Sequence, residues 1–117
     1  MTVPIVEQIA RLNDRCRQGL DPNARIVVTR NCLARLAGDG GVVREVVAQA
    51  ELMAAVRRYS FQPGDGPERD FGAFDLQGQR ILFKIDCYDL DFEFGSEDPA
   101  DASITRRVIT IMLAEDY

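Results

Sequence analysis

Residues 71–87 read FGAFDLQGQRILFKIDC, and this stretch decides the class of fold. In its second half apolar residues alternate with polar ones, which is the period of a β-strand with one buried face. The apolar positions are Ile81, Phe83, Ile85 and Cys87. The sequence Gln77-Gly78-Gln79 predicts a tight turn between this strand and another strand over 71–76.

Upstream of this stretch the apolar residues follow helical spacing. Over 4–17 they recur every three or four positions, which predicts an amphipathic helix with Thr2 as its N-cap. A second helix is predicted over 42–59, with an apolar face made of Val43, Val46, Val47, Ala50, Met53, Ala54 and Val56. Between the two helices, residues 25–30 predict a short strand, and residues 31–36 a single helical turn.

Beyond this hairpin the apolar positions change parity, because Leu90, Phe92 and Phe94 carry even numbers. A shift of one residue turns a strand over, so we expect a turn near residues 88–89 and a further hairpin strand after it. Residues 105–114 read TRRVITIMLA, which is apolar on both faces and rich in β-branched side chains. This pattern is typical of a central strand.

The order helix, strand, helix and then three or four strands predicts an α+β fold. We expect two or three helices on one face of a mostly antiparallel sheet of four or five strands, with the strand over 25–30 at an edge. A length of 117 residues is typical of a single domain, here 1–117. Neither a signal peptide nor a bilayer-spanning run is evident, so we expect a cytoplasmic protein that does not enter a membrane.

Composition excludes several classes of function. The chain has no histidine, which excludes Ser-His-Asp chemistry, imidazole general bases and histidine metal ligands. Its three cysteines are Cys16, Cys32 and Cys87, and this odd number without a CxxC pair excludes a disulfide framework and a four-cysteine zinc site. We therefore expect free, partly buried thiols in a reducing compartment. No glycine-rich phosphate motif is present, and we expect no cofactor.

Charge gives a further limit on partners. The formal net charge is −5, so general attraction to nucleic acid or to an anionic membrane is not expected. Acidic residues gather between Lys84 and Arg106 with no basic residue among them. These residues, the acidic set, are Asp86, Asp89, Asp91, Glu93, Glu97, Asp98 and Asp101. They are the predicted partner-binding residues, and no catalytic residue or metal ligand is assigned.

Three interpretations of the acidic set compete. It could be a divalent-metal site of a small hydrolase using Asp86, Asp89 and Glu97, although alternate strand residues lie about 6–7 Å apart. It could be a docking face for a protein partner with a basic surface. It could also be a solvated strand face that prevents edge pairing and maintains solubility.

If the hairpin strand forms, Asp89, Asp91 and Glu93 line one of its faces while the intervening apolar residues pack inward. Arg106 and Arg107 come directly before the last predicted strand. We expect them to pair with Glu97, Asp98 or Asp101 and so to hold the acidic loop, each exposed pair contributing about 0–1 kcal/mol.

Several motifs make the chain resemble a small bacterial family. They are residues 68–74 (ERDFGAF), 83–89 (FKIDCYD), 95–101 (GSEDPAD) and 107–117 (RVITIMLAEDY). The family is described only as a domain of unknown function, and it is associated with proteobacterial chromosomes, plasmids and phages. The resemblance implies one domain that ends at the C-terminal tyrosine, and it implies no site residue because the family has no established activity.

The chain departs from this family at two positions. Members usually carry a histidine where Arg69 stands and often a tyrosine where Cys87 stands. The missing histidine argues against a histidine-dependent enzyme. The leading hypothesis is a non-enzymatic interaction module, by analogy an inhibitor that a mobile element directs at a host nucleic-acid-handling or defence system. The alternatives are the metal-dependent hydrolase and a structural homo-oligomer that uses its edge strands or second helix.

Overall fold

The computed structural model describes residues 2–117. Within this range the chain forms three α-helices and four β-strands. The helices are α1 (Ile5–Arg17), α2 (Arg30–Ala37) and α3 (Gly41–Arg58), and the strands are β1 (Arg25–Val28), β2 (Phe71–Leu76), β3 (Gln79–Tyr88) and β4 (Arg106–Leu113). Short 3₁₀ turns occupy Pro63–Asp65 and Ala114–Asp116. None of the helices in this range is both long and apolar enough to cross a membrane.

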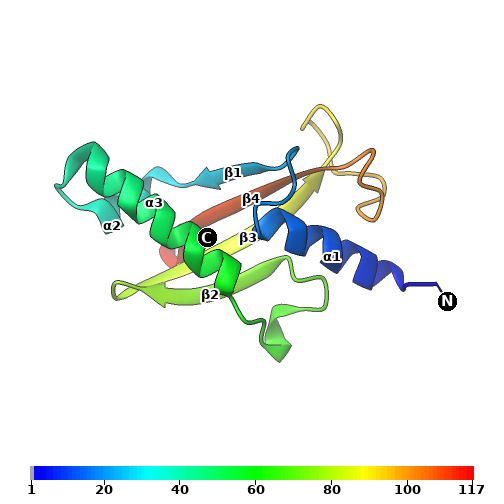
Figure 1. Ribbon diagram of the computed structural model, residues 1–117, viewed down its shortest axis with the longest axis horizontal. Coiled ribbons are helices and arrows are strands. Elements are labelled where there is room, and N and C mark those ends of the chain that lie inside the picture. Colours follow the sequence, from blue (N-terminus) through cyan, green and yellow to red (C-terminus); the bar gives the residue numbers. More distant parts are fainter. Residues whose placement is uncertain (1) are drawn as a thin grey trace.

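The strands form one sheet in the order β1-β4-β3-β2 (Figure 1). β3 pairs antiparallel with both β2 and β4, and Ile85 lies opposite Ile109. β1 pairs parallel with β4, with Ile26 opposite Ile109. The α+β class and the mostly antiparallel sheet are therefore confirmed, as are the edge position of β1 and the central position of β4. The parallel pair between two segments so distant in sequence had no signal in the sequence.

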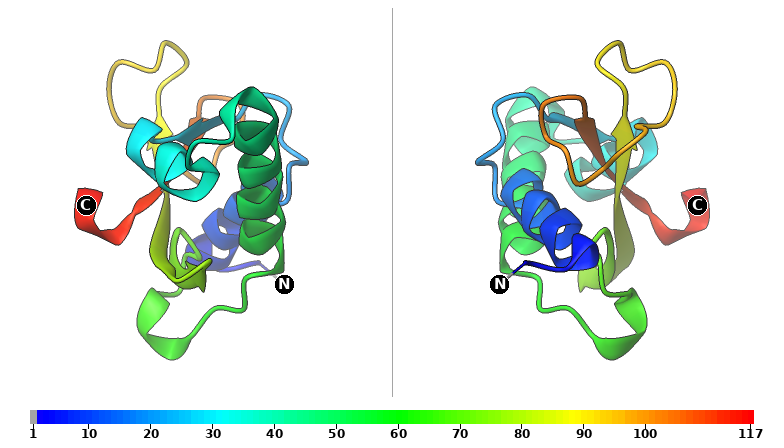
Figure 2. Two further views of the ribbon diagram at one scale, coloured as in Figure 1. Left: turned by 90° about the vertical axis from the view of Figure 1, so that its left-hand side faces the viewer. Right: turned by 90° about the vertical axis from the view of Figure 1, so that its right-hand side faces the viewer.

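The main core lies between one face of the sheet and the helices, and α2 contributes Cys32 and Leu36 to it. α1 and α3 cover the same face, while α2 follows β1 at the end of the sheet (Figure 2). The alternation along β3 directs Ile81, Phe83 and Ile85 toward these helices, and all three are buried. Leu52 and Val56 of α3 meet them and are fully buried. The opposite face of the sheet is left without a covering helix within residues 2–117 (Figure 2).

Two local predictions about helix starts need correction. Thr2 does not cap α1: the residue before the helix is Pro4, whose fixed φ suits a helix start and whose side chain makes no capping hydrogen bond. α2 is longer than the single turn predicted over 31–36. Thr29 is responsible, because its hydroxyl accepts a hydrogen bond from the amide of Cys32 at 3.3 Å and fixes the start of the helix one residue earlier.

The first half of α3 does not bury the face that the apolar spacing predicts. Val43 and Val46 are 73% and 63% exposed, and Val47 and Ala50 are also exposed. This half of the helix runs alongside α2 beyond the end of β1 (Figure 1), so no strand lies beneath the valines. The buried residues of α3 are Ala48 near its middle and Leu52, Met53 and Val56 in its second half, and it is this second half that packs on the sheet.

Gly72, Phe83 and Tyr59 are packed closely together in this core. Gly72 on β2 lies opposite Phe83 on β3, and Tyr59 follows the end of α3. The rings of Tyr59 and Phe83 meet edge to face with centroids 5.3 Å apart. A Cβ atom at Gly72 would come within 2.5 Å of Phe83 and 2.6 Å of Tyr59. Glycine is therefore required here by space rather than by backbone conformation.

The hairpin strand expected at residues 90–94 does not form. Asp89 prevents it, because its Oδ1 atom accepts the amide hydrogens of Asp91 at 3.1 Å and Glu93 at 3.0 Å. These amides are satisfied locally and do not enter a ladder. Phe92 takes a left-handed backbone with φ of 58°. The turn predicted at residues 88–89 is present, and an isolated bridge joins Tyr88 to Gly95.

Candidate functional site

The acidic set lies almost entirely in the connection between β3 and β4, residues 89–105, which we call the β3–β4 loop. This loop projects from one end of the sheet (Figure 1). Asp86 is the exception, because it lies within β3 and pairs with Lys84, the Nζ atom being 2.8 Å from Oδ2. The hydrogen bond from Lys84 to Asp86 raises the pKa of the lysine. Asp86 is therefore neutralised by a neighbouring cation.

Three acidic residues of the loop stabilise its own backbone. Besides Asp89, Asp98 accepts the amide hydrogen of Ala100 at 3.1 Å. Asp101 accepts hydrogen bonds from the amide of Ser103 at 2.9 Å and from its hydroxyl at 2.6 Å. These bonds lower the pKa of Asp101, since they favour its charged form. Each of the three carboxylates accepts a hydrogen bond from the backbone amide two residues later and so stabilises a short turn of the loop.

The remaining carboxylates of the loop are Asp91, Glu93 and Glu97, and all are exposed. No side-chain hydrogen bond or ion pair engages them within residues 2–117. The carboxylate row predicted on a strand face is thus wrong. Three unpaired charges on an irregular loop stand in its place.

Apolar side chains are exposed beside these charges. Leu90, Phe94 and Ile104 are 48%, 72% and 38% exposed. They border a hollow of about 510 Å³ that Asp91 and Glu97 also line. We call this surface the acidic hollow; its full lining is Asp89, Leu90, Asp91, Phe94, Gly95, Glu97 and Ile104. Large exposed apolar side chains rimmed by charge are typical of a binding surface.

The predicted pairing of Arg106 and Arg107 with loop carboxylates is wrong. Arg107 is only 2% exposed, because it shares the helix-facing side of β4 with Ile109 and Ile111. Its Nε atom donates to Oδ1 of Asn13 at 2.7 Å, and its Nη2 atom donates to the backbone oxygen of Pro99 at 2.6 Å. Arg107 therefore holds the β3–β4 loop through a backbone carbonyl. Arg106 bonds the carbonyl of Thr105.

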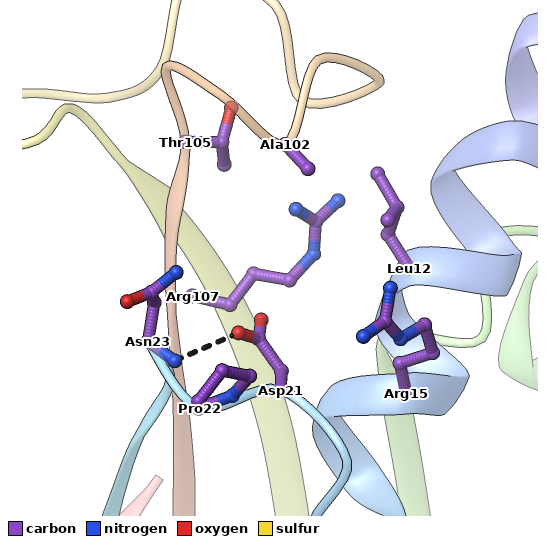
Figure 3. Close-up of a pocket in the computed structure, with 8 residues that line it drawn as sticks. All are labelled: Leu12, Arg15, Asp21, Pro22, Asn23, Ala102, Thr105 and Arg107. Carbon is purple, nitrogen blue, oxygen red and sulfur yellow. Dashed lines mark hydrogen bonds between the residues drawn. The ribbon is translucent and has the colours of Figure 1, made fainter.

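A smaller cavity of about 190 Å³ lies behind the loop, between it and α1. The guanidinium of Arg107 enters this cavity, with Ala102 of the loop and Leu12 of α1 around it (Figure 3). This cavity and the burial of Arg107 were not predicted from the sequence. One signal for it exists, since Arg107 is in phase with the buried residues Ile109 and Ile111 of the same strand.

The metal-site interpretation gains no support from the geometry. Within residues 2–117, no group of three or more His, Cys, Asp or Glu side chains is placed to hold a metal ion. Asp86, Asp89 and Glu97, proposed as ligands, are not brought together: the first pairs with Lys84 and the second closes a turn.

The expectation of free, partly buried thiols is confirmed. Cys16 and Cys32 are buried, Cys87 is half-buried, and none is in a disulfide. Burial raises the pKa of Cys16 to about 12 and that of Cys32 to about 11. A nucleophilic cysteine needs a lowered pKa, so both thiols are suited to packing rather than to reaction.

From these raised pKa values we predict that the protein loses stability at alkaline pH. The folded protein keeps the thiol of Cys16 protonated up to about pH 12, whereas in the unfolded chain this thiol loses its proton near its ordinary pKa of 9.0. The stability that depends on the protonated thiol is therefore complete below pH 9 and is lost as the pH rises toward 12. We expect the free energy of unfolding to fall by up to about 1.4 kcal/mol per pH unit for each thiol in this window. Urea titrations with reductant at pH 8 to 11 measure it. The variant Cys16→Ala should decline less steeply, and an equal slope would contradict the assignment.

Comparison with known proteins gives one finding. The family model described as "Protein of unknown function (DUF3768)" matches residues 32–116, which include most of α2, all of α3, the whole β3–β4 loop and every strand except β1. No curated protein and no solved structure matches the chain. A match over this much of the sequence confirms the expected membership of a family of unknown function. The chain belongs to the family described as protein of unknown function DUF3768.

Proposed function

We propose that the protein is a non-enzymatic interaction module whose acidic hollow binds a basic, partly apolar segment of a protein partner. The observation that carries this proposal is the combination of unpaired Asp91, Glu93 and Glu97 with exposed Leu90 and Phe94 on one projecting loop. Apolar contact supplies affinity, while the carboxylates steer a cationic partner and set its orientation.

The order within the loop supports the same proposal. Asp89, Asp98 and Asp101 bond the backbone of the loop itself, so its shape is maintained before a partner arrives. A surface that is already ordered binds with a smaller loss of conformational entropy. Three carboxylates therefore stabilise the loop, and the other three, Asp91, Glu93 and Glu97, are exposed to solvent and are free to contact a partner.

The class of partner follows from charge. Proteins that handle nucleic acid present the basic patches that an acidic hollow of this kind complements. We infer a host nucleic-acid-handling or defence protein in the bacterial cytoplasm as the partner, and a mobile element as the setting. The motifs at residues 83–89 and 95–101 resemble those of a protein family associated with bacterial chromosomes, plasmids and phages, and this resemblance supports the setting.

Affinity capture from native cytoplasm tests the proposal. Tagged wild type is compared with a loop variant that carries Asp91→Asn, Glu93→Gln and Glu97→Gln. We expect the loop variant to bind its partner about 10- to 100-fold more weakly, since three interfacial charges at about 0.5–1 kcal/mol each are lost. Added salt should weaken capture by the wild type, because exposed charges are screened.

The matched control removes the same amount of charge elsewhere. It carries Asp39→Asn, Glu45→Gln and Asp75→Asn, which are exposed positions outside the β3–β4 loop. This control should capture the partner as the wild type does, and all three proteins should unfold at similar temperatures. Equal capture by the loop variant and the control, or no partner for the wild type, would count against the proposal.

A further inference from the structure

Arg107 is a buried cation without a buried counter-ion. Arg17 is the comparable case: it is 5% exposed, and its Nη2 atom lies 2.9 Å from Oδ1 of Asp14. Arg107 is 2% exposed, bonds only the neutral oxygens of Asn13 and Pro99, and forms no ion pair within residues 2–117. Removing a charge from water without pairing it is costly, so buried cations ordinarily have an anion beside them.

The unused donors of Arg107 face the cavity behind the β3–β4 loop. A guanidinium presents several N–H donors in a planar fork, and the two hydrogen bonds engage only Nε and Nη2. Nη1 has no hydrogen-bond partner among the described residues. Figure 3 shows the guanidinium lying within the cavity, between Ala102 and Leu12. The cavity of about 190 Å³ has room for roughly six water molecules or one small ligand group.

The other charges at the cavity leave it positive. Arg15 lines it from α1, and its Nη2 atom makes only a long hydrogen bond of 3.3 Å to the carbonyl of Leu20. Asp21 also lines it, but its Oδ1 atom is engaged by the amide of Asn23 at 2.9 Å, and it pairs with neither arginine. Two guanidinium groups therefore face one carboxylate in a protein whose overall charge is negative.

We propose that this cavity is a binding site for a small oxyanion, the phosphate or carboxylate group of a small-molecule ligand. Arg107 supplies the fixed donor fork, held in place by Asn13 and Pro99, and Arg15 supplies a second cation at the more exposed side. Planar forks of this kind match the two oxygens of a carboxylate or phosphate group. The site stands on the geometry of Arg107 and is independent of the proposed protein partner.

Titration with inorganic phosphate and, separately, with acetate tests the site. The full chain carries ¹⁵N-labelled arginine and backbone, and ionic strength is kept constant with chloride in Tris buffer. We expect a saturable shift of the Nε–H signal of Arg107 and of the Thr105 and Ala102 amides. Saturation by phosphate alone identifies a phosphate group, and saturation by acetate alone identifies a carboxylate; either supports the proposal.

Variants separate this site from general salt effects. Arg15→Ala removes an exposed guanidinium and should weaken binding about tenfold, the effect of losing one charge-assisted hydrogen bond. Arg107→Lys keeps the charge but loses the fork, and should weaken binding at least as much. Arg58→Ala, at the end of α3, removes the same charge elsewhere and should bind as the wild type does. No saturable shift in the wild type, or equal affinity in Arg15→Ala and Arg58→Ala, would overturn the proposal.

Discussion

Replacing Phe83 with alanine is expected to lower the free energy of unfolding by about 3–5 kcal/mol and the melting temperature by about 10–20 °C. Phe83 is fully buried at the centre of the sheet, on the strand that pairs with two neighbours. Its ring contacts those of Tyr59 and Phe61 edge to face, with centroids 5.3 and 6.1 Å away. Truncation removes both the buried ring and the surface on which these aromatics rest.

Phe94→Ala is the matched control for this experiment. It removes the same side chain from a position that is 72% exposed, so the expected change is within about 0.5 kcal/mol. Gly72→Ala probes the same contact from the other side, because its new Cβ would lie 2.5 Å from the ring of Phe83. We expect this overpacking to cost about 1–3 kcal/mol. Urea denaturation measures all three variants, and similar losses for Phe83→Ala and Phe94→Ala would contradict the assigned core.

Replacing Asn13 with alanine is expected to cost about 3 kcal/mol of folding free energy, which is large for a single polar side chain. Asn13 is 1% exposed on α1 and satisfies two distant partners at once. Its Oδ1 atom accepts from Nε of Arg107 at 2.7 Å, and its Nδ2 atom donates to the carbonyl of Glu68 at 2.9 Å. Without it, the buried Arg107 loses one of its two hydrogen-bond acceptors and the carbonyl of Glu68 loses the amide donor of Asn13.

The control for this experiment is Asn31→Ala. Asn31 also donates one side-chain hydrogen bond, to Asp116 at 2.9 Å, but it does so at the surface, so the expected loss is below about 1 kcal/mol. The double variant Asn13→Ala with Arg107→Met should lose less than the sum of its single variants, because no buried guanidinium is then left without the Asn13 acceptor. Additive losses of stability, or a loss below about 1 kcal/mol for Asn13→Ala, would show that Asn13 and Arg107 do not stabilise the fold through their hydrogen bond.

Where one local rule decides the structure, the sequence was a sufficient guide. The alternation along residues 81–87 predicted β3, because one face of that strand is buried and the other is not. The apolar character of both faces over 105–114 predicted the central place of β4, since β4 has a strand on each side. The parallel pairing of Arg25 with Val108 had no such signal, because strand neighbours are chosen by tertiary packing.

The errors arose where one side chain or the length of a neighbour overrides a pattern. Asp89 captures two amides and ends the strand pattern that Leu90, Phe92 and Phe94 continue in the sequence. The valines of α3 have helical spacing, but they lie beyond the strands that would cover them. In the candidate site, the exposure of Asp91, Glu93 and Glu97 agrees with their predicted place at the surface. The burial of Arg107 was missed because the acidic residues Glu97, Asp98 and Asp101 were expected to be its partners, whereas it donates to the neutral oxygens of Asn13 and Pro99.

The parallel pairing of β1 with β4 has a consequence for how the chain folds during synthesis. β1 ends at Val28, yet its only sheet partner among the described residues, 2–117, is β4, which begins at Arg106. While the ribosome is still making the residues between them, β1 has no neighbour to receive its backbone hydrogen bonds, and β3 has only β2. The sheet therefore closes after β4 has emerged, and a nascent chain that stalls before that point exposes the apolar faces of both strands to aggregation.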